Sequence, residues 1–302
     1  MTAGKERNVK KVAIIGAGPA GLAAALQLKR FGISALLLEG DHVGGLLRNA
    51  NLVENYPGFP GGIAGKELVD LFWKQAEKIG VEVTFETVTE LARVGSVFQI
   101  STTSSIHQSH LVVVASGTVP VIFDKAMVSD DIRQRIFYEV YPLLSEESKR
   151  IVIIGAGDAA FDYALNLARK NDVIVLNRAE HTRCLPLLWD RAAASDRIQY
   201  RPKTSVSIFT GSPYNSVCLE CESSSGKEII EADYVIGALG REPSLDFLSA
   251  SLRKVARDLE HQGVLHLIGD VHNGLYRQTT IAVGEGIRAA MHICQLLKEF
   301  VQ

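Results

Sequence analysis

Two glycine-rich loops in the chain each stand between a short β-branched run and a helical segment. The first loop, GAGPAG, has the spacing G-x-G-x-x-G from residue 16, and the second, GAGDAA, has G-x-G-x-x-A from residue 155. In this pattern the first glycine permits a tight turn, the second lets the backbone approach a pyrophosphate, and the third position lets the helix pack on the strand. The N-terminus of the helix then attracts the phosphate charge. The chain is therefore expected to hold two nucleotides.

The segments around each loop repeat one order of elements, which indicates a duplication at the scale of a domain. Residues 12–39 form one predicted βαβ unit, and the pattern starts again at Arg150. Each unit is followed by short alternating runs with turn residues between them, typical of a small antiparallel insert. After Pro243 we expect one clear strand and one long helix, too little for a domain, so this tail should pack back onto the first section.

The predicted fold is therefore α/β, with two Rossmann-like domains of three layers (ββα), the second inserted into the first. We expect a discontinuous dinucleotide-binding domain at 1–117 and 245–302, and a second dinucleotide-binding domain at 118–244.

The residue that ends the second strand of each unit differs between the two sites. Glu39 stands there in the first unit, where an acid accepts hydrogen bonds from the ribose hydroxyls of an adenosine. The second unit has Asn177, with Arg178 and Arg183 just beyond it. Arginine binds a 2′-phosphate through paired charged hydrogen bonds, which favours NADPH over NADH. Glu180 lies close by and partly offsets this charge, so use of NADH stays open.

The composition is that of a globular protein, with 47% hydrophobic and 22% charged residues among 302. A formal net charge of −2 argues against a general nucleic-acid binder. The start of the chain is polar and predicts no signal peptide, and no apolar run is long enough to span a bilayer. We expect a cytoplasmic protein with no metal site.

Four cysteines are scattered along the chain, and only Cys218 and Cys221 have the C-x-x-C spacing of a redox pair. The segment around them reads as strand, turn and strand. Residues three apart in a strand point to opposite faces with Cα atoms ~10 Å apart, whereas a disulfide needs about 7 Å or less. We therefore expect two ordinary strand cysteines, and an inert cysteine at Cys184.

Several motifs together resemble the low-molecular-weight thioredoxin reductase family of flavoproteins, over nearly the whole chain. The segment GGLLRNANLVENYPGF is similar to the family's flavin-side segment, with Leu46 where glutamine is usual. VVASGT is similar to its crossover motif, with Ser116 for the usual threonine. IGDVHNGLYRQTTIAVGEG resembles its C-terminal FAD motif, and NRAEHTR its 2′-phosphate loop, in which Ala179 stands at a position that is usually basic.

The resemblance implies that the domain at 1–117 and 245–302 binds FAD, that the domain at 118–244 binds NADPH (or NADH), and that particular residues contact each cofactor. For FAD these are Gly16, Gly18, Pro19, Ala20, Gly21, Glu39, Gly44, Gly45, Leu46, Asn55, Val88, Ser116, Gly117, Asp270, Arg277, Gln278 and Thr279. For NAD(P)H they are Gly155, Gly157, Asp158, Ala159, Asn177, Arg178 and Arg183.

A dithiol reductase of this family carries C-x-x-C shortly before the second glycine-rich strand, and here that place holds Glu139-Val140-Tyr141-Pro142. One branch of the family, the thioredoxin-reductase-like ferredoxin (or flavodoxin) NADP reductases, also lacks the dithiol. FYEVYPL and GAGDAAFDYAL are similar to segments of that branch. That branch commonly continues past the last helix, whereas this sequence ends at Gln302, and its YRQ triplet is more like thioredoxin reductase.

Three functions remain open from the sequence. The first is an FAD enzyme that exchanges a hydride between NAD(P)H and flavin and uses an external acceptor such as ferredoxin or flavodoxin, with no catalytic side chain required because the cofactors carry the chemistry. The second is a reductase of a small substrate: a disulfide, quinone, polysulfide or oxygen. The third is a flavin-binding sensor or scaffold. The resemblance also implies a homodimer, and either a rotating or a fixed second domain.

Overall fold

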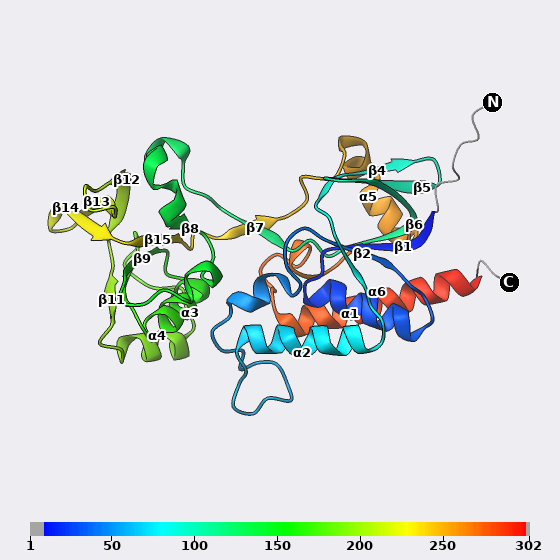
Figure 1. Cartoon of the computed structure of the whole chain (residues 1–302), viewed down its shortest axis with the longest axis horizontal. Coiled ribbons are helices and arrows are strands. Elements are labelled where there is room, and N and C mark those ends of the chain that lie inside the picture. Colours follow the sequence, from blue (N-terminus) through cyan, green and yellow to red (C-terminus); the bar gives the residue numbers. More distant parts are fainter. Residues whose placement is uncertain (1–8, 300–302) are drawn as a thin grey trace. The chain divides into compact units, whose positions relative to one another are not determined.

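The computed structural model describes residues 9–299. Most of the polar start of the chain, for which we expect no signal peptide, therefore lies outside the described residues. The chain divides into two compact units (Figure 1). The first unit consists of Met1–Arg48, Glu54–Val119 and Glu242–Gln302, and the second of Asn49–Val53 and Pro120–Arg241. Within the described part, no helix has the length and apolar character needed to cross a membrane.

The first unit is built on a sheet with the order β3-β2-β1-β6-β5-β4, and β17 also pairs with β6. β1, β2, β3, β6 and β17 run parallel, while β5 and β4 continue the sheet antiparallel. The bounds are β1 Lys10–Ile15, β2 Leu36–Glu39, β3 Val83–Phe85, β4 Val88–Val94, β5 Val97–Thr102, β6 Ile106–Val114 and β17 Leu265–Leu267. Its helices are α1 Pro19–Arg30, α2 Gly65–Lys78, α5 Ala250–His261 and α6 Thr279–Glu299, with 3-10 turns η1 Gly45–Asn49 and η5 Gly269–Val271.

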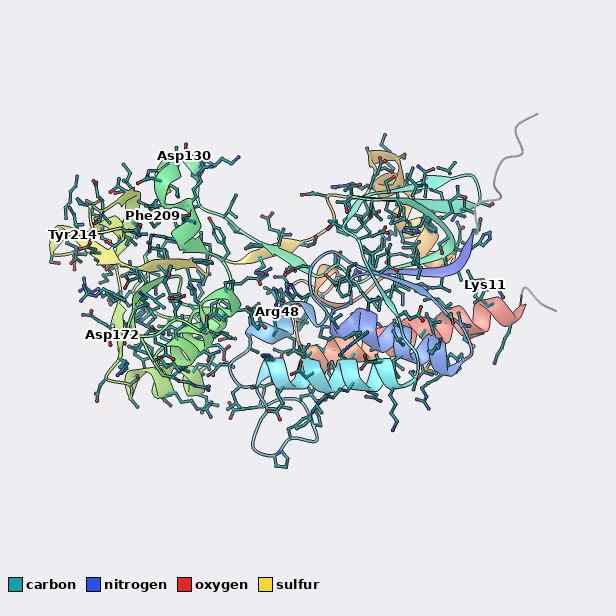
Figure 2. All side chains as sticks on the ribbon, in the orientation of Figure 1. Lys11, Arg48, Asp130, Asp172, Phe209 and Tyr214 are labelled. Carbon is teal, nitrogen blue, oxygen red and sulfur yellow. The ribbon has the colours of Figure 1, made fainter. Side chains whose placement is uncertain are left out.

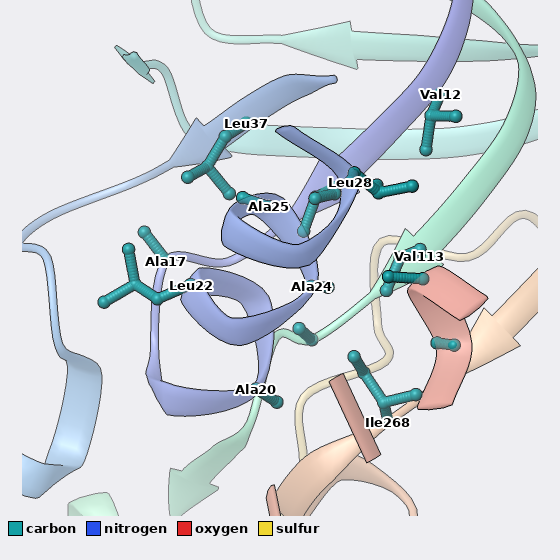
Figure 3. Close-up of a cluster of buried hydrophobic side chains, with 14 of the residues drawn as sticks. Val12, Ala17, Ala20, Leu22, Ala24, Ala25, Leu28, Leu37, Val113 and Ile268 are labelled. Carbon is teal, nitrogen blue, oxygen red and sulfur yellow. The ribbon is translucent and has the colours of Figure 1, made fainter. Parts of the chain in front are cut away.

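Two apolar cores lie on opposite faces of this sheet, which gives the unit three layers. On one face, Val12 and Val113 of the sheet meet Leu28 of α1 and residues of α6 (Figure 3). On the other face, Leu91 and Phe98 of the antiparallel strands pack with α5. The helices α1 and α6 approach closely because residue 286 is glycine: a Cβ there would lie 2.2 Å from the Ala20 carbonyl oxygen.

The second unit repeats this plan with a parallel sheet of order β11-β10-β9-β15-β8 and a separate antiparallel sheet β12-β13-β14. Its strands are β8 Ile136–Phe137, β9 Arg150–Ile154, β10 Asp172–Leu176, β11 Ile198–Arg201, β12 Ser205–Gly211, β13 Val217–Ser223, β14 Gly226–Ala232 and β15 Tyr234–Gly237. Its helices are α3 Asp158–Leu167 and α4 Pro186–Ala193, with 3-10 turns η2 Lys125–Met127, η3 Asp130–Arg135 and η4 Tyr141–Leu143. Two of the places where the chain passes from one unit to the other lie in paired strands, β7 Thr118–Pro120 and β16 Arg241–Pro243.

The core of the second unit also lies on both faces of its parallel sheet. Phe161 of α3 and Ile153 of β9 belong to the helical side. Phe209, labelled in Figure 2, is fully buried on the other side and meets the ring of Phe123 at 4.8 Å between centroids. The prediction of two Rossmann-like α/β domains is confirmed.

Three local predictions were incomplete or wrong. β3 belongs to the parallel sheet, paired with β2, and not to the antiparallel insert, because it directly follows the crossover helix α2. The tail after Pro243 contains a second helix, α5, whose buried Leu252 and Leu259 are separated by mostly charged residues that obscure its apolar face. The short helix α4 was not predicted either.

Candidate nucleotide-binding sites

The first glycine-rich loop has the close approaches that its spacing predicts. Gly16 has φ +101°, and a Cβ there would lie 2.4 Å from the Ala115 carbonyl oxygen. A Cβ at Gly21 would lie 1.9 Å from the Gly16 carbonyl oxygen. A Cβ at Gly18, in contrast, would have no protein atom within 4 Å, so the loop is open where a pyrophosphate would approach.

The start of α1 is suited to an anion. Gly18 is the N-cap and offers no side-chain cap, and Pro19 takes the first helical position. The amides of the first turn therefore stay available to a phosphate, in the field of the helix dipole.

Glu39 fixes the shape of this loop. Its Oε2 accepts a hydrogen bond from Ala17 N at 2.7 Å, and its Oε1 accepts one from Asp41 N at 2.9 Å. A carboxylate has about four lone-pair sites, so both oxygens keep capacity for ribose hydroxyls. Glu39 could thus hold the loop and a ribose together.

The flavin-side segment begins directly beside the glycine-rich loop. Gly44 N donates to Ala17 O at 2.8 Å, and a Cβ at Gly44 would lie 2.3 Å from Val69 of α2, so only glycine fits. Gly45 follows with φ +53°, and Leu46 is half-buried. The segment is therefore seated on both the loop and α2.

The C-terminal FAD motif meets the same segment. Asn55 Nδ2 donates to Gln278 Oε1 at 2.7 Å, and Thr280 Oγ1 donates to Asn55 O at 3.4 Å. Gln278 immediately precedes Thr279, the first residue of α6. The fold thus brings together two predicted flavin residues that are far apart in the sequence.

Glu285 of α6 holds the loop that carries Asp270. Its Oε2 accepts from Gly269 N at 2.6 Å and from Asn273 Nδ2 at 2.8 Å. Asp270 and Arg277 are half-buried and have polar contacts of their own. Glu285 was not predicted, because nothing in the sequence separates it from an ordinary helix-surface acid.

Three further predicted FAD residues have supporting positions. The Ser116 hydroxyl donates to Ser244 O at 2.7 Å, and Gly117 O accepts from Ser244 N at 3.0 Å, so both connect the segment before β7 with the segment after β16. Val88 starts β4, opposite Thr102 of β5.

The second glycine-rich loop repeats the geometry of the first. Gly155 has φ +130°, and a Cβ there would lie 2.2 Å from the Ala238 carbonyl oxygen. A Cβ at Gly157, in contrast, would have no protein atom within 4 Å. Asp158 and Ala159 are exposed at the start of α3, and Asp158 Oδ1 accepts from Leu185 N at 2.7 Å. This acid therefore ties the following loop to the helix N-terminus.

Asn177 organises the loop that follows β10. Its side chain is buried, with Nδ2 donating to His181 O at 3.0 Å and to the Tyr200 hydroxyl at 2.9 Å. Its Oδ1 accepts from Ala179 N at 3.0 Å. The structure therefore gives Asn177 the role of a support for the loop, whereas it was predicted to contact the nucleotide.

The two predicted arginines are exposed on this loop. Arg178 follows Asn177 directly, and Arg183 N donates to Ala156 O of the glycine-rich loop at 2.9 Å. The backbone of Arg183 is thus held beside the place where a pyrophosphate would lie, and both guanidinium groups are accessible to an anion.

A polar network of the second unit includes Glu139 and Tyr141, in the segment where the sequence predicts that a dithiol is missing. Asn49 Nδ2 donates to Glu139 Oε2 at 3.1 Å, and Asn49 Oδ1 accepts from Tyr141 N at 3.0 Å. Arg241 lies 3.4 Å from the other Glu139 oxygen. Tyr138 faces the core, where its ring contacts Phe123 with 5.6 Å between centroids. These side chains pack and hydrogen-bond within the unit.

The same unit holds residues 49–53 through Asp162 of α3. Asp162 Oδ2 accepts from Asn51 N at 2.8 Å, and Arg169 donates to Asn51 Oδ1 at 2.7 Å. Burial raises the pKa of Asp162 to about 6, although the backbone donors at Asn51 and Leu52 favour its ionised form. Asn49 and Asp162 were not predicted as partners, since no local pattern links them.

The cysteines lie as the sequence predicts. Cys218 and Cys221 are on β13, where Cys221 is buried and burial raises the pKa of its thiol to about 11. Cys184 is half-buried, Cys294 is buried in α6, and all four are free thiols. Within the described chain, no group of three or more His, Cys, Asp or Glu residues could hold a metal ion.

Comparison with known proteins agrees with this geometry. Residues 10–286 match the family model described as pyridine nucleotide-disulphide oxidoreductase. The chain belongs to this family. It is 27% identical to a thioredoxin reductase of Borreliella burgdorferi, covering 96% of this chain and 93% of that one. It is 26% identical to a thioredoxin reductase of Mycolicibacterium smegmatis, covering 97% and 98%.

Among solved structures, this oxidoreductase resembles the thioredoxin reductase of Lactococcus lactis, with a TM-score of 0.82 and 25% identity over 96% of this chain and 99% of that one. The expectation of a thioredoxin-reductase-like flavoprotein enzyme is confirmed, and its cofactors are FAD and NAD(P)H.

Proposed function

We propose that this chain is an FAD-dependent NAD(P)H oxidoreductase that delivers electrons directly to an external acceptor, without an internal dithiol. The observation that supports the proposal is the Glu139–Asn49–Tyr141 network, because the resemblance expects the dithiol in the segment that contains Glu139 and Tyr141. A carboxylate, an amide and a phenol cannot form a disulfide. Thiols elsewhere do not replace it, because Cys218 and Cys221 belong to one strand and Cys294 is buried.

The residues proposed to hold FAD are those of the first unit. The open Gly18 and the first turn of α1 would take the pyrophosphate, and Glu39 the adenosine ribose. Asn55 and Gln278 would orient the ring system. When bound, FAD supplies the exchange of a hydride with NAD(P)H and the passage of two electrons onward. The second glycine-rich loop and the loop 177–185 would hold NAD(P)H.

The acceptor class follows from the family more than from this site. A small disulfide is favoured because the matched family is named for disulphide reduction. Two electrons and two protons convert such a disulfide to two thiols. Ferredoxin or flavodoxin, expected from the sequence, gains no support from the relatives, whose names are those of thioredoxin reductases. We also infer a homodimer, as the resemblance implies, and a cytoplasmic location, as the few scattered cysteines and the polar start of the sequence suggest.

The proposal is tested by anaerobic titration of the purified yellow protein with NADPH and with NADH. We expect at least one of them to bleach the flavin absorbance, and the reduced protein to be reoxidised by an acceptor from a panel of small disulfides, quinones, ferredoxin and flavodoxin. If neither nucleotide bleaches the flavin, the proposal is wrong, and a binding role without turnover takes its place.

A further inference from the structure

A lysine from outside the loop 177–183, which is proposed to bind the 2′-phosphate, contacts this loop with its side chain. Lys203 lies in the turn between β11 and β12, and its Nζ is 2.8 Å from Oε1 of Glu180, in the middle of the loop 177–183. The NRAEHTR motif alone offers Arg178 and Arg183 as side chains with fixed positive charge, because Ala179 stands at the third position. Lys203 therefore adds a third such charge to the loop.

The backbone holds Lys203 at this place. Lys203 N donates to Ala179 O at 3.1 Å, and Thr204 N donates to Asn177 O at 2.9 Å. On the other side, Asn177 N donates to Arg201 O at 3.0 Å. The turn is thus bonded to the loop on both sides of Lys203, and its backbone lies directly beside the residue that lacks a basic side chain.

The conformation of Lys203 is unusual for its residue type. Its φ is 51°, and among the described residues only Ser148 and Asn215 share a positive φ without being glycine. Glycine or asparagine is the ordinary choice for such a turn. Glycine or asparagine would adopt this conformation with less strain but would carry no charge. The presence of lysine here therefore favours a role for its charged side chain.

The charges around the loop favour an anion. The loop and its lysine carry three cationic side chains, Arg178, Arg183 and Lys203, and one carboxylate, Glu180, whose pKa is lowered by its hydrogen bond from Lys203. The neighbouring Arg201 is paired with Glu228 at 2.9 Å. The ammonium of lysine has three donors, so its contact with Glu180 leaves two for a phosphate.

We propose that Lys203, with Arg178 and Arg183, recognises the 2′-phosphate of NADPH and takes the place that Ala179 leaves without a basic side chain. This rests on the proposed function, in which the loop 177–183 binds the adenosine end of NAD(P)H. Glu180 holds the ammonium at the loop in the free protein and competes with the phosphate when the nucleotide binds.

The test measures the affinities of the full-length, FAD-loaded protein for 2′,5′-ADP and for 5′-AMP by calorimetry. In the wild type, 2′,5′-ADP should bind more tightly. Lys203→Met should reduce this preference about tenfold, which corresponds to about 1.4 kcal/mol, with 5′-AMP binding unchanged. Lys203→Arg should retain most of the preference, and Glu180→Gln should increase it.

Lys170 provides a matched control. It forms an exposed ion pair with Glu147 in the same unit, but it precedes Asp172, at the opposite end of β10 from Asn177. Lys170→Met should leave the preference unchanged. Bleaching of the flavin in Lys203→Met by NADPH or NADH at saturating concentration shows that the variant is folded and that the proposed function holds. Equal preferences in Lys203→Met, Lys170→Met and the wild type would overturn the inference, as would a wild type without any preference.

Discussion

Asn55 and Gln278 are separated by 223 positions in the sequence, yet the Asn55 Nδ2 donates to the Gln278 Oε1 at 2.7 Å. This bond joins the flavin-side segment to the C-terminal motif within the first unit. Replacement of either residue by leucine removes the bond and one of the two amide groups proposed to orient the ring system. We expect Asn55→Leu and Gln278→Leu each to weaken FAD binding by about 1 kcal/mol, measured by fluorescence of released FAD. FAD affinities equal to the wild type in both variants would argue against this role.

The two glycines Gly18 and Gly21 should respond differently to alanine. A Cβ at Gly21 would lie 1.9 Å from a backbone oxygen, so Gly21→Ala should lower the unfolding free energy of the FAD-free protein by about 1–3 kcal/mol. Gly18→Ala meets open space and should leave that stability unchanged while it weakens FAD binding. Denaturant unfolding and FAD titration of the two variants measure both effects. Destabilisation of the FAD-free protein by Gly18→Ala would contradict the assignment.

Asp162 should make the stability of the second unit depend on pH. Its pKa is raised to about 6 by burial, whereas an unfolded aspartate titrates near 3.9. Between these values the folded state keeps a proton that the unfolded state has lost, so this contribution to stability falls as the pH rises from about 4 to about 6. Arg169 and Asp158 act on the same carboxyl with opposite signs.

Asp162→Asn keeps an acceptor for Asn51 N and removes the buried charge. Relative to the wild type, it should gain stability on the order of 2 kcal/mol between pH 4 and pH 7, measured by urea unfolding. Asp172→Asn, at the exposed start of β10, serves as the control and should show no such trend. A pH-independent difference between Asp162→Asn and the wild type would refute the prediction.

The cysteine pair Cys218 and Cys221 should be dispensable for electron transfer. Cys221 is buried with a pKa raised to about 11, so it should resist alkylation at pH 8 in the folded protein. Cys218→Ser and Cys221→Ser should both keep the rate of flavin reduction by NAD(P)H, measured by stopped-flow absorbance. A loss of more than about tenfold in Cys218→Ser would indicate a role that the strand geometry does not explain.

The sequence predicts the parts of the fold that depend on local patterns. The spacing of Gly16, Gly18 and Gly21 fixes the turn, the open loop and the helix approach, and the structure has all three. The strand around Cys218 was likewise read from alternation alone.

What could not be predicted depends on contacts between distant residues. Asp162 and Asn49 bind segments that no spacing connects to them. Lys203 reaches the loop 177–183 from the turn between β11 and β12, and the buried Asn177 side chain bonds within the unit where its position suggested a ligand contact. The helix α5 was not predicted because charged residues separate its few apolar residues.

The central claim, electron delivery without an internal dithiol, is tested most directly by counting electrons. Anaerobic titration with dithionite, followed by absorbance and by assay of new thiols, gives the reducing equivalents that each FAD-loaded chain takes up. Flavin reduction consumes two electrons, and a redox-active disulfide would consume two more. The account predicts uptake of two electrons per FAD with no new thiols. Uptake of four electrons, with two new thiols per chain, would contradict it.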